Sequence, residues 1–511
     1  MNQRTLIRAG VAVLAIAALL AWKHRTDEPR RTREAGTAVQ PRAGGFDYGD
    51  LHFVRCELPQ PHGSATTAAW CAPFELPENR EAASPGRRIG LRLALIASEA
   101  AAPEPDPVVL LAGGPGQSAV ESWPQVASAF APLLRHRHVL LLDQRGTGGS
   151  NALACPRHDE DAVTGFDPVV VRTQAQACLD RVSTHADPRH YTTAAALDDL
   201  EALRVAIGSP RLNLVGVSYG TRVAQQYMKR HPDAVRSVVL DSAVPNDVVL
   251  GSEFAANLDD SLRLQLDACR ATPACADVFG DPWQRLRSLQ AKLRQAPIDV
   301  QYRDPVDHAL HDARLDASML AMLARIYAYA PETAALLPLT VERAHAGDAA
   351  PMFGQLRMLE RDLESLGENA MQYSVVCAED APWLEPRVQD ADTVLGSMLA
   401  DVFRETCAIW PRGTRAADFA EPARGDTPVL LVAGEFDPIT PPRYAERIAA
   451  ALPNSRVLVA KGQGHSVMGR GCLPRLVGEF VAELDPAGLD AGCVADFGPL
   501  PAFLDFNGAA P

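Results

Sequence analysis

Three residues that lie far apart in the chain have the types and the order that acyl transfer by a serine requires. Ser218 stands in a Gly-x-Ser-x-Gly pattern, Asp437 follows an apolar run, and His465 lies in a glycine-flanked loop. Such chemistry needs a base that takes the hydroxyl proton and an acid that orients the base. We therefore expect Ser218 to be the nucleophile, His465 its base and Asp437 the acid.

Two other carboxylates compete with Asp437 for the role of the acid. Glu435 lies two residues earlier, nearer the end of the apolar run, and Asp241 comes just past another such run. The alternative for the serine is an ordinary turn between strand and helix with an idle hydroxyl, and for the histidine a surface loop. His465 is favoured because it is the only one of 13 histidines in a glycine-flanked loop directly after the last predicted strand.

The sequence around Ser218 predicts the elements that would expose its hydroxyl. Residues 212–217 are apolar and predict a strand, and residues 221–230 have helical spacing. Ser218 would sit on the tight turn between them. Gly216 and Gly220 are required there because a Cβ at either position would collide with the neighbouring strand or helix.

The other apolar runs place the remaining candidates at the same edge of one sheet. They predict strands at residues 108–112, 138–142, 235–240, 428–434 and 456–460. In a parallel sheet the loops that follow such strands meet at the carboxyl edge. We therefore expect an α/β fold with a mostly parallel sheet, preceded by an opening β region over residues 46–98.

Backbone amides beside Ser218 could stabilise the oxyanion of an acyl-transfer reaction. The strand at 108–112 ends in Gly-Gly-Pro-Gly, and these glycines let backbone amides approach a ligand closely. The residue after the nucleophile supplies a second amide. We expect Gly114 and Tyr219 to be the two donors, and this chemistry requires no metal or organic cofactor.

The α/β pattern is interrupted by residues 252–370, which are largely helical in pattern. An all-helical insertion between strands is typical of a cap over the carboxyl edge of the sheet. The expected organisation is an export or anchor segment at 1–34, a core in two parts at 46–245 and 426–495, a cap with its return segment at 246–425, and a tail at 496–511.

The glycine-rich loop at residues 143–150 is assigned a structural role. Its spacing matches neither a Walker loop nor a Gly-x-Gly-x-x-Gly fingerprint, so we exclude nucleotide binding. Asp143 and Arg145 are expected to fix the loop by an ion pair.

A second polar motif, His308-x-x-His311, has Asp304, Asp307 and Asp312 nearby. It lacks the helix-borne glutamate of zinc hydrolases, so we read it as a solvated polar face and not as a metal site.

The N-terminus and the cysteines indicate export. Arg4 and Arg8 precede an apolar stretch at 9–22 that has the length of a signal-peptide core, although without a clean cleavage site, so a membrane anchor stays open. Ten cysteines without Cys-x-x-Cys indicate disulfides formed in an oxidising compartment. We propose that near neighbours pair: Cys56–Cys71, Cys155–Cys178, Cys269–Cys275, Cys377–Cys407 and Cys472–Cys493. A net charge of -14 argues against a nucleic-acid partner.

Five motifs in order resemble those of the proline iminopeptidase and tripeptidyl aminopeptidase group of α/β hydrolases, especially its secreted tripeptidyl aminopeptidase-like branch. The likeness spans roughly residues 46–495. Iminopeptidases usually begin the first motif with histidine, where Ala112 stands here, which favours the tripeptidyl branch. The motifs are Gly-Gly-Pro-Gly-Gln-Ser (113–118), Asp-Gln-Arg-Gly-Thr-Gly-Gly-Ser (143–150), Gly-Val-Ser-Tyr-Gly-Thr (216–221), Gly-Glu-Phe-Asp-Pro-Ile-Thr-Pro (434–441) and Gly-Gln-Gly-His (462–465).

The resemblance implies a secreted or periplasmic serine exopeptidase that removes short units from peptides with a free N-terminus. It carries over the roles of nucleophile, acid, base and oxyanion donors given above. It also implies that cap carboxylates hold the substrate's amine, because a buried ammonium must be paired. Glu379 and Asp380 are the candidates, against the alternative of a plain loop pair or helix cap. The competing functions are a carboxylesterase and a catalytically silent α/β-hydrolase fold used for binding.

Overall fold

The computed structural model describes residues 40–42, 44–59, 66–81, 86–155, 167–364 and 369–509. The segment at 1–34, in which an export signal or anchor is predicted, lies outside these residues. Within the described part of the chain, no helix combines the length and apolarity that a membrane span would need.

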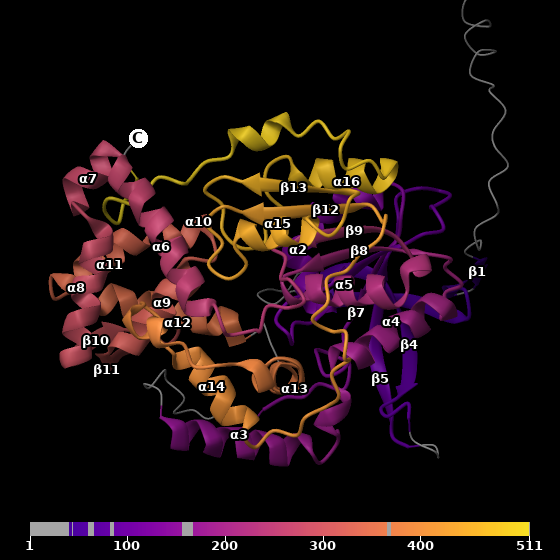
Figure 1. Cartoon of the computed structure of the whole chain (residues 1–511), viewed down its shortest axis with the longest axis horizontal. Helices are drawn as coiled ribbons and strands as arrows, with labels where there is room; N and C mark the ends of the chain where they lie inside the picture. The colour runs from indigo at the N-terminus through magenta and orange to yellow at the C-terminus, as the bar shows by residue number, and fades with distance from the viewer. Residues whose placement is uncertain are drawn as a thin grey trace, which may run out of the picture. The chain divides into compact units, whose positions relative to one another are not determined.

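An eleven-stranded sheet lies at the centre of the described fold (Figure 1). Its order is β1-β2-β3-β4-β5-β7-β6-β8-β9-β12-β13. The pairs from β1 to β7 are antiparallel, and those from β7 to β13 are parallel. The expected α/β fold with an opening β region is confirmed. The strands are β1 (Gln40–Arg42), β2 (Gly45–Tyr48), β3 (Leu51–Pro59), β4 (Thr66–Pro77), β5 (Arg88–Ile96), β6 (Val108–Leu111), β7 (Val139–Leu142), β8 (Leu212–Val217), β9 (Val235–Asp241), β12 (Val429–Gly434) and β13 (Ser455–Ala460).

Helices cover the parallel half of the sheet and bury its side chains. Because successive residues of a strand face opposite sides, Val108 and Leu110 of β6 share one buried cluster with Phe130 of α2 and Phe480 of α16. These parallel strands are short and almost wholly apolar, as expected for strands that are buried on both faces. The helices of the core are α2 (Ala119–Leu134), α4 (Thr193–Ala206), α5 (Tyr219–Arg230), α15 (Pro442–Ala449) and α16 (Leu473–Glu483), whereas α3 (Pro168–Val182) packs against helices of the return segment.

The chain between β9 and β12 forms a cap with its own apolar cluster. The arrowheads of β12 and β13 point towards the cap helices, so the loops that follow these strands face the cap (Figure 1). The cap helices are α6 (Phe254–Ala271), α7 (Pro273–Phe279), α8 (Pro282–Gln295), α9 (Ala317–Tyr327), α10 (Pro331–Ala334), α11 (Leu337–His345), α12 (Ala350–Glu364), α13 (Asn369–Glu379) and α14 (Met398–Cys407).

The expectation of an all-helical cap is wrong in one place. Residues Ile298–Arg303 (β10) and Leu310–Leu315 (β11) form an antiparallel hairpin. The hairpin buries Val300 and Tyr302 on one face and leaves the alternating residues Asp299, Gln301 and Arg303 exposed. This alternation is the signature of a half-buried strand, but it is too short here to stand out among the surrounding helices.

Within residues 151–190, which follow the glycine-rich loop, the chain forms the helix α3. Asp167 caps this helix by accepting hydrogen bonds from the amides of Val169 and Val170. Cys178 lies on α3 and pairs with Cys155, as proposed.

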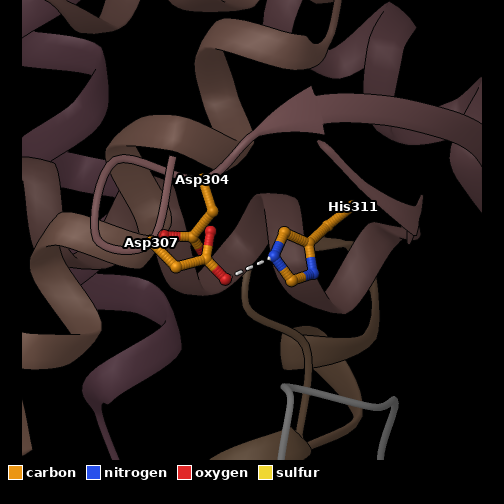
Figure 2. A group of neighbouring side chains, drawn as sticks. All are labelled: Asp304, Asp307 and His311. Carbon is orange, nitrogen blue, oxygen red and sulfur yellow. Dashed lines mark hydrogen bonds and ion pairs between the residues drawn. The ribbon is translucent and has the colours of Figure 1, made fainter. Parts of the chain in front are cut away.

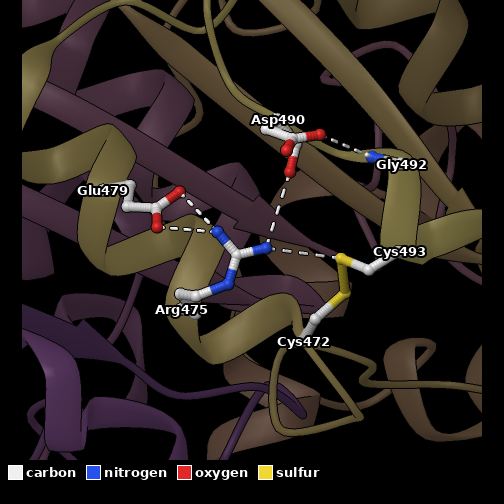
Figure 3. The surroundings of a disulfide bond; sticks show 6 residues. All are labelled: Cys472, Arg475, Glu479, Asp490, Gly492 and Cys493. Atoms are coloured by element: carbon white, nitrogen blue, oxygen red, sulfur yellow. Dashed lines mark hydrogen bonds and ion pairs between the residues drawn. A yellow bond between two sulfur atoms is a disulfide. The ribbon is translucent and has the colours of Figure 1, made fainter.

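All five proposed disulfides are confirmed. Figure 3 shows Cys472, at the start of α16, bonded to Cys493 in the segment that follows this helix. Arg475 lies beside this bond and pairs with Glu479 one turn further along α16. The disulfide therefore fastens the chain beyond α16 to the helix itself. Five disulfides indicate a protein that folds in an oxidising compartment.

Candidate active site

Ser218 occupies a strained turn between β8 and α5. Its φ of 54° and ψ of -121° lie outside the regions that most residues adopt. An added Cβ on Gly216 would lie 2.5 Å from the carbonyl oxygen of Gly220, and one on Gly220 would lie 2.0 Å from the carbonyl oxygen of Leu111. The two glycines are therefore required by close backbone contacts, as the motif predicts, and the turn presents the serine at the carboxyl edge of the sheet.

The acid and the base of the predicted triad are in direct contact. His465 Nδ1 lies 2.8 Å from Asp437 Oδ2. Asp437 also accepts hydrogen bonds from the amides of Ile439 and Thr440 and from the Thr440 hydroxyl, each at 2.8 Å. This arrangement leaves the carboxylate fully satisfied and fixes the plane of the imidazole.

Electrostatics favour the ionised form of the acid and make the base more basic than an ordinary histidine. Burial alone would raise the pKa of Asp437, but the adjacent His465 and the hydrogen bonds hold it below its ordinary value. Burial alone would lower the pKa of His465, but the charges of Asp437 and Asp241 outweigh burial and raise it. An ionised carboxylate can only accept hydrogen bonds, so the His465 Nδ1 must carry the proton and Nε2 is the basic nitrogen.

In the described part of the chain, neither competing carboxylate hydrogen-bonds to the imidazole. Glu435 accepts from the amide of Gly462, at 2.8 Å. Asp241 accepts from the amides of Val467 and Met468, each at 2.9 Å. Both side chains therefore hold the loop that carries His465, while Asp437 holds the ring.

The cap reaches the histidine through Tyr329, a contact that the sequence did not reveal. The amide of His465 donates to the carbonyl of Tyr329 at 2.8 Å, and the two rings meet edge to face, 5.3 Å apart. Gly464 is needed at this crossing, because its added Cβ would lie 2.2 Å from the same carbonyl oxygen. The glycine beside His465 was the one available signal that another segment passes close by.

The loop that carries Gly114, a predicted oxyanion donor, lies next to the serine. An added Cβ on Gly113 would stand 3.2 Å from the Cβ of Ser218, and Gly114 has a φ of 105° that favours glycine. The end of this loop is fixed by Asp143, which accepts from the Ser118 hydroxyl at 2.6 Å and from the amide of Val120 at 2.9 Å. The other predicted donor, Tyr219, directly follows the nucleophile at the start of α5.

The expected ion pair between Asp143 and Arg145 is wrong. Arg145 instead forms a two-pronged pair with Asp199 of α4, with both contacts at 2.6 Å. Asp143 accepts a further hydrogen bond from the amide of Gly149. Because its own loop and the start of α2 satisfy Asp143, the guanidinium turns to a carboxylate 54 residues away.

Glu379, a candidate for the substrate amine, ends a buried chain of hydrogen bonds that starts next to the nucleophile. Thr193 donates to the Glu379 carboxylate through its amide at 2.6 Å and its hydroxyl at 2.7 Å. The Thr193 hydroxyl also lies 2.7 Å from the Tyr219 hydroxyl. Since the Thr193 proton points to Glu379, Tyr219 is the donor in that bond. Burial raises the pKa of Glu379 to about 7.

Asp380, the other candidate for the amine, is engaged in a buried ion pair. Both of its oxygens accept from Arg222 Nη1, at 3.1 and 3.0 Å, and Oδ1 also accepts from the amide of Leu250. Arg222 belongs to α5, so the pair joins the nucleophile helix to the segment that returns from the cap. A substrate amine at Asp380 would have to compete with this guanidinium.

The polar group around His311 lies in the cap, at the hairpin between β10 and β11. Figure 2 shows Asp304, Asp307 and His311 close together, with His311 Nε2 2.8 Å from Asp307 Oδ2. Asp304 is buried and accepts from Arg357 Nε at 3.0 Å. Asp307 and His311 are exposed, and Asp312 accepts from Gln301 on the opposite strand. The partners of this group are those of a polar hairpin surface.

Trp123 and Trp383 have different surroundings. Trp123 is buried in the core beside Phe130 and is a packing residue. Trp383 is half exposed, and the Arg415 guanidinium lies over its ring.

Comparison with known proteins assigns the family. The family described as alpha/beta hydrolase fold matches residues 106–469. The chain is 25% identical over 435 residues to serine protease Hip1 of Mycobacterium tuberculosis, which covers 76% of this chain and 81% of that relative. It is 27% identical over 396 residues to a tripeptidyl aminopeptidase of Streptomyces lividans, with 70% of each chain covered.

Further matches include an esterase and a solved peptidase structure. Carboxylesterase B of Mycobacterium tuberculosis is 26% identical over 398 residues, with 71% of this chain and 75% of that relative covered. A structure of proline iminopeptidase from Mycobacterium smegmatis aligns with a TM-score of 0.38 at 17% identity, covering 82% of this chain and all of that one. By the match over residues 106–469, the chain belongs to the alpha/beta hydrolase fold family, as a serine hydrolase that resembles the serine peptidases among its relatives.

Proposed function

We propose that this protein is a serine exopeptidase that cleaves short units from the N-termini of peptides through an acyl-enzyme. The observation that carries the proposal is the buried contact between His465 Nδ1 and Asp437 Oδ2, at 2.8 Å, beside the nucleophile turn of Ser218. The names of two relatives, a serine protease and a tripeptidyl aminopeptidase, support the substrate class.

In the proposed reaction, Ser218 Oγ attacks the scissile carbonyl carbon while His465 Nε2 takes the hydroxyl proton. The amides of Gly114 and Tyr219 donate to the oxyanion that forms on the carbonyl oxygen. The intermediate collapses when the C–N bond breaks and His465 returns the proton to the leaving amine. A water molecule then attacks the acyl-enzyme by the same route, which releases the N-terminal fragment and restores Ser218. Asp437 stays ionised throughout and stabilises the imidazolium.

Recognition of the free N-terminus is assigned to Glu379 in preference to Asp380. Asp380 already has Arg222 as its cationic partner, whereas the hydrogen bonds to the Glu379 side chain come from the neutral Thr193. A buried carboxylate with neutral partners gains more from an incoming ammonium than one that is already paired. The raised pKa of Glu379, about 7, reflects the same lack of compensation.

The test compares a peptide amide that has a free amine with its N-acetylated counterpart. An exopeptidase that reads the ammonium cleaves the first at a kcat/KM roughly tenfold or more above the second, because a hydrogen bond to a charged group is worth about 1.5–3 kcal/mol. Equal cleavage of both would refute the exopeptidase proposal and leave a less selective hydrolase.

An esterase is the second candidate, because one relative is named carboxylesterase B. The same triad would then cleave small esters, and the acetylated and free-amine amides would both be poor substrates beside a simple aryl ester. Labelling with a fluorophosphonate probe separates both enzymes from a silent binding protein, since only an activated Ser218 reacts. Labelling that persists in Ser218→Ala would refute the assigned nucleophile.

We further propose that the protein is exported, to the periplasm or beyond the cell, with residues 1–34 as the signal or anchor. The five disulfides support an oxidising destination. Cell fractionation and N-terminal sequencing of the mature protein would test this. An intact N-terminus in the cytosolic fraction would contradict it.

A further inference from the structure

One residue, Asp241, contacts both the nucleophile turn and the loop of the catalytic base. It is the last residue of β9, and its backbone carbonyl accepts from the amide of Ser218 at 2.9 Å. Its carboxylate accepts from two successive amides after His465, with Oδ1 bonded to Val467 and Oδ2 to Met468, each at 2.9 Å. The side chain is 2% exposed, so water does not compete for these bonds.

The next residue extends the same contact. The Ser242 hydroxyl accepts from the amide of Ser466 at 2.8 Å and itself lies 3.2 Å from Asp241 Oδ1. Ser242 and Ser466 both have positive φ values, 57° and 66°, which are uncommon for residues other than glycine. The three consecutive amides of residues 466–468 are thus held by the side chains of Asp241 and Ser242 at the end of β9. This contact requires the positive φ of Ser242 and of Ser466.

The two oxygens of Asp241 explain why a carboxylate stands here. Two amide protons point at the side chain, so both terminal atoms must be acceptors, and only an ionised carboxylate provides that. An asparagine would present its NH₂ group to one of the amides. Asp241 also acts on the base through its charge, since it is one of the groups that raise the pKa of His465. The other charged groups that act on His465 are Asp437, which raises its pKa, and Arg325 of α9, which lowers it.

We propose that Asp241 is a positioning residue, which sets the separation and orientation of Ser218 and His465 by binding the backbone on both sides. The inference rests on the proposed triad and adds to it a residue that contacts neither substrate nor the reacting atoms. Its neighbour Ser242 assists through the amide of Ser466. The role is distinct from that of Asp437, whose carboxylate contacts the ring and not the loop.

The test uses Asp241→Asn, with Asp106→Asn as the matched control. Asp106 is also a buried aspartate, but it lies before β6 at the opposite edge of the sheet, where it accepts from Arg137 at 2.7 Å and from Asn213 at 2.8 Å. Fluorophosphonate labelling rates, kcat and KM are measured across pH for both variants and for Ser218→Ala. Circular dichroism and thermal unfolding establish that each variant is folded.

We expect Asp241→Asn to lower kcat by about ten- to a hundredfold with little change in KM, because small misplacements of catalytic groups are costly. The acidic limb of the plot of kcat/KM against pH reports the pKa of His465 in the enzyme without substrate. This limb should move to lower pH, since a negative charge near the imidazole is lost. Asp106→Asn should leave that limb in place. Ser242→Ala keeps the charge, so it should lower kcat by a few-fold without moving the limb.

An unmoved limb in Asp241→Asn, or a loss of kcat no greater than that in Asp106→Asn, would overturn the inference while leaving the triad intact. If Asp241→Asn does not fold, an unchanged kcat in Ser242→Ala would overturn it instead. Activity that survives in Ser218→Ala is a different failure, because it would remove the proposed function itself and the positioning role with it.

Discussion

The catalytic loops of the core and the cap that faces them are held by different kinds of contact. In the core, carboxylates bind backbone amides: the buried Asp143 holds the start of α2, the buried Asp241 holds the loop after His465, and the partly buried Glu435 holds the start of that loop. The cap has its own apolar cluster and meets the catalytic loops through hydrogen bonds from neutral groups, such as the Tyr329 carbonyl on the amide of His465 and the Ser261 hydroxyl on the carbonyl of Phe436.

The two kinds of contact have different consequences for catalysis. Backbone amides held by buried acceptors cannot drift without leaving a donor unsatisfied, so the core loops are preorganised whether or not substrate is present. The cap meets these loops through neutral groups, such as the side chains of Asn257 and Ser261 on the carbonyls of Ile439 and Phe436, and such hydrogen bonds are weaker than those to a carboxylate. We therefore expect substitutions in the core loops to act mainly on kcat, and substitutions in the cap and its return segment to act mainly on stability or KM.

The largest effect should follow removal of the nucleophile. Ser218→Ala is expected to lower kcat by roughly a million-fold and Asp437→Asn by roughly ten thousand-fold, with KM little changed, because these groups act in the transition state. Steady-state kinetics on a peptide amide measures both. Ser183→Ala, an exposed serine at the end of α3, is the control and should behave as wild type. Substantial peptidase activity in Ser218→Ala would show that the core loops do not carry the nucleophile.

The next largest effect should come from the buried pair that joins α5 to the return segment. Asp380→Asn leaves the Arg222 charge buried without a partner and should lower the free energy of unfolding by about 3–5 kcal/mol. The control is Asp418→Asn, which breaks a pair between Lys229 and the exposed carboxylate of Asp418 and should cost about 0–1 kcal/mol. Urea unfolding measures both. Equal losses in the two variants would show that the buried pair does not join cap and core in the way proposed.

The sequence predicts the features that depend on local spacing and misses those that depend on contacts between distant segments. The nucleophile turn, the acid and the base follow from local spacing: glycines where backbones touch, and functional residues directly after strands. Asp241 was considered only as a rival acid, and Tyr329 was not considered, because their partners lie more than a hundred residues away and only the fold brings them together. The cap hairpin was missed because Val300 and Tyr302 alternate over too few residues.

The wrong ion pair has a related cause. Asp143 and Arg145 were joined because they are close in sequence, but each has better partners from elsewhere: a helix start for the carboxylate and Asp199 for the guanidinium. Sequence proximity favours a pair only when no distant group competes for the same hydrogen bonds.

Substitution of Glu379 should have a smaller effect, on the KM of only one of two substrates. Glu379→Gln should raise KM for a free-amine peptide by about ten- to a hundredfold and leave that of the N-acetylated peptide unchanged, because a charged hydrogen bond is lost only with the first. The matched control is Glu385→Gln, an exposed glutamate on the same return segment. If both substrates respond equally, Glu379 supports Thr193 and Tyr219 and does not bind the amine.

The pH dependence of Glu379 sharpens the same test. Burial raises its pKa from 4.5 to about 7, so the folded protein keeps a proton that the unfolded chain has already lost. The free energy of unfolding should therefore fall as pH rises from about 4.5 to about 7, and this slope should be weaker in Glu379→Gln. Thermal unfolding at several pH values measures it. An identical slope in both proteins would show that Glu379 is ionised throughout this range.

The smallest effect is expected at the contact between cap and histidine. Tyr329→Phe removes the hydroxyl that accepts from Arg325 at 3.1 Å, but it keeps the ring against His465 and the carbonyl that holds the amide of His465. One lost hydrogen bond should cost about 1 kcal/mol in the free energy of unfolding and change kcat by less than about twofold. Tyr327→Phe, in the same cap segment and bonded to Gln355, serves as the control. A tenfold fall in kcat confined to Tyr329→Phe would mean that the cap acts on the imidazole through this hydroxyl. The division between core loops that act on kcat and a cap that acts on stability or KM would then no longer hold.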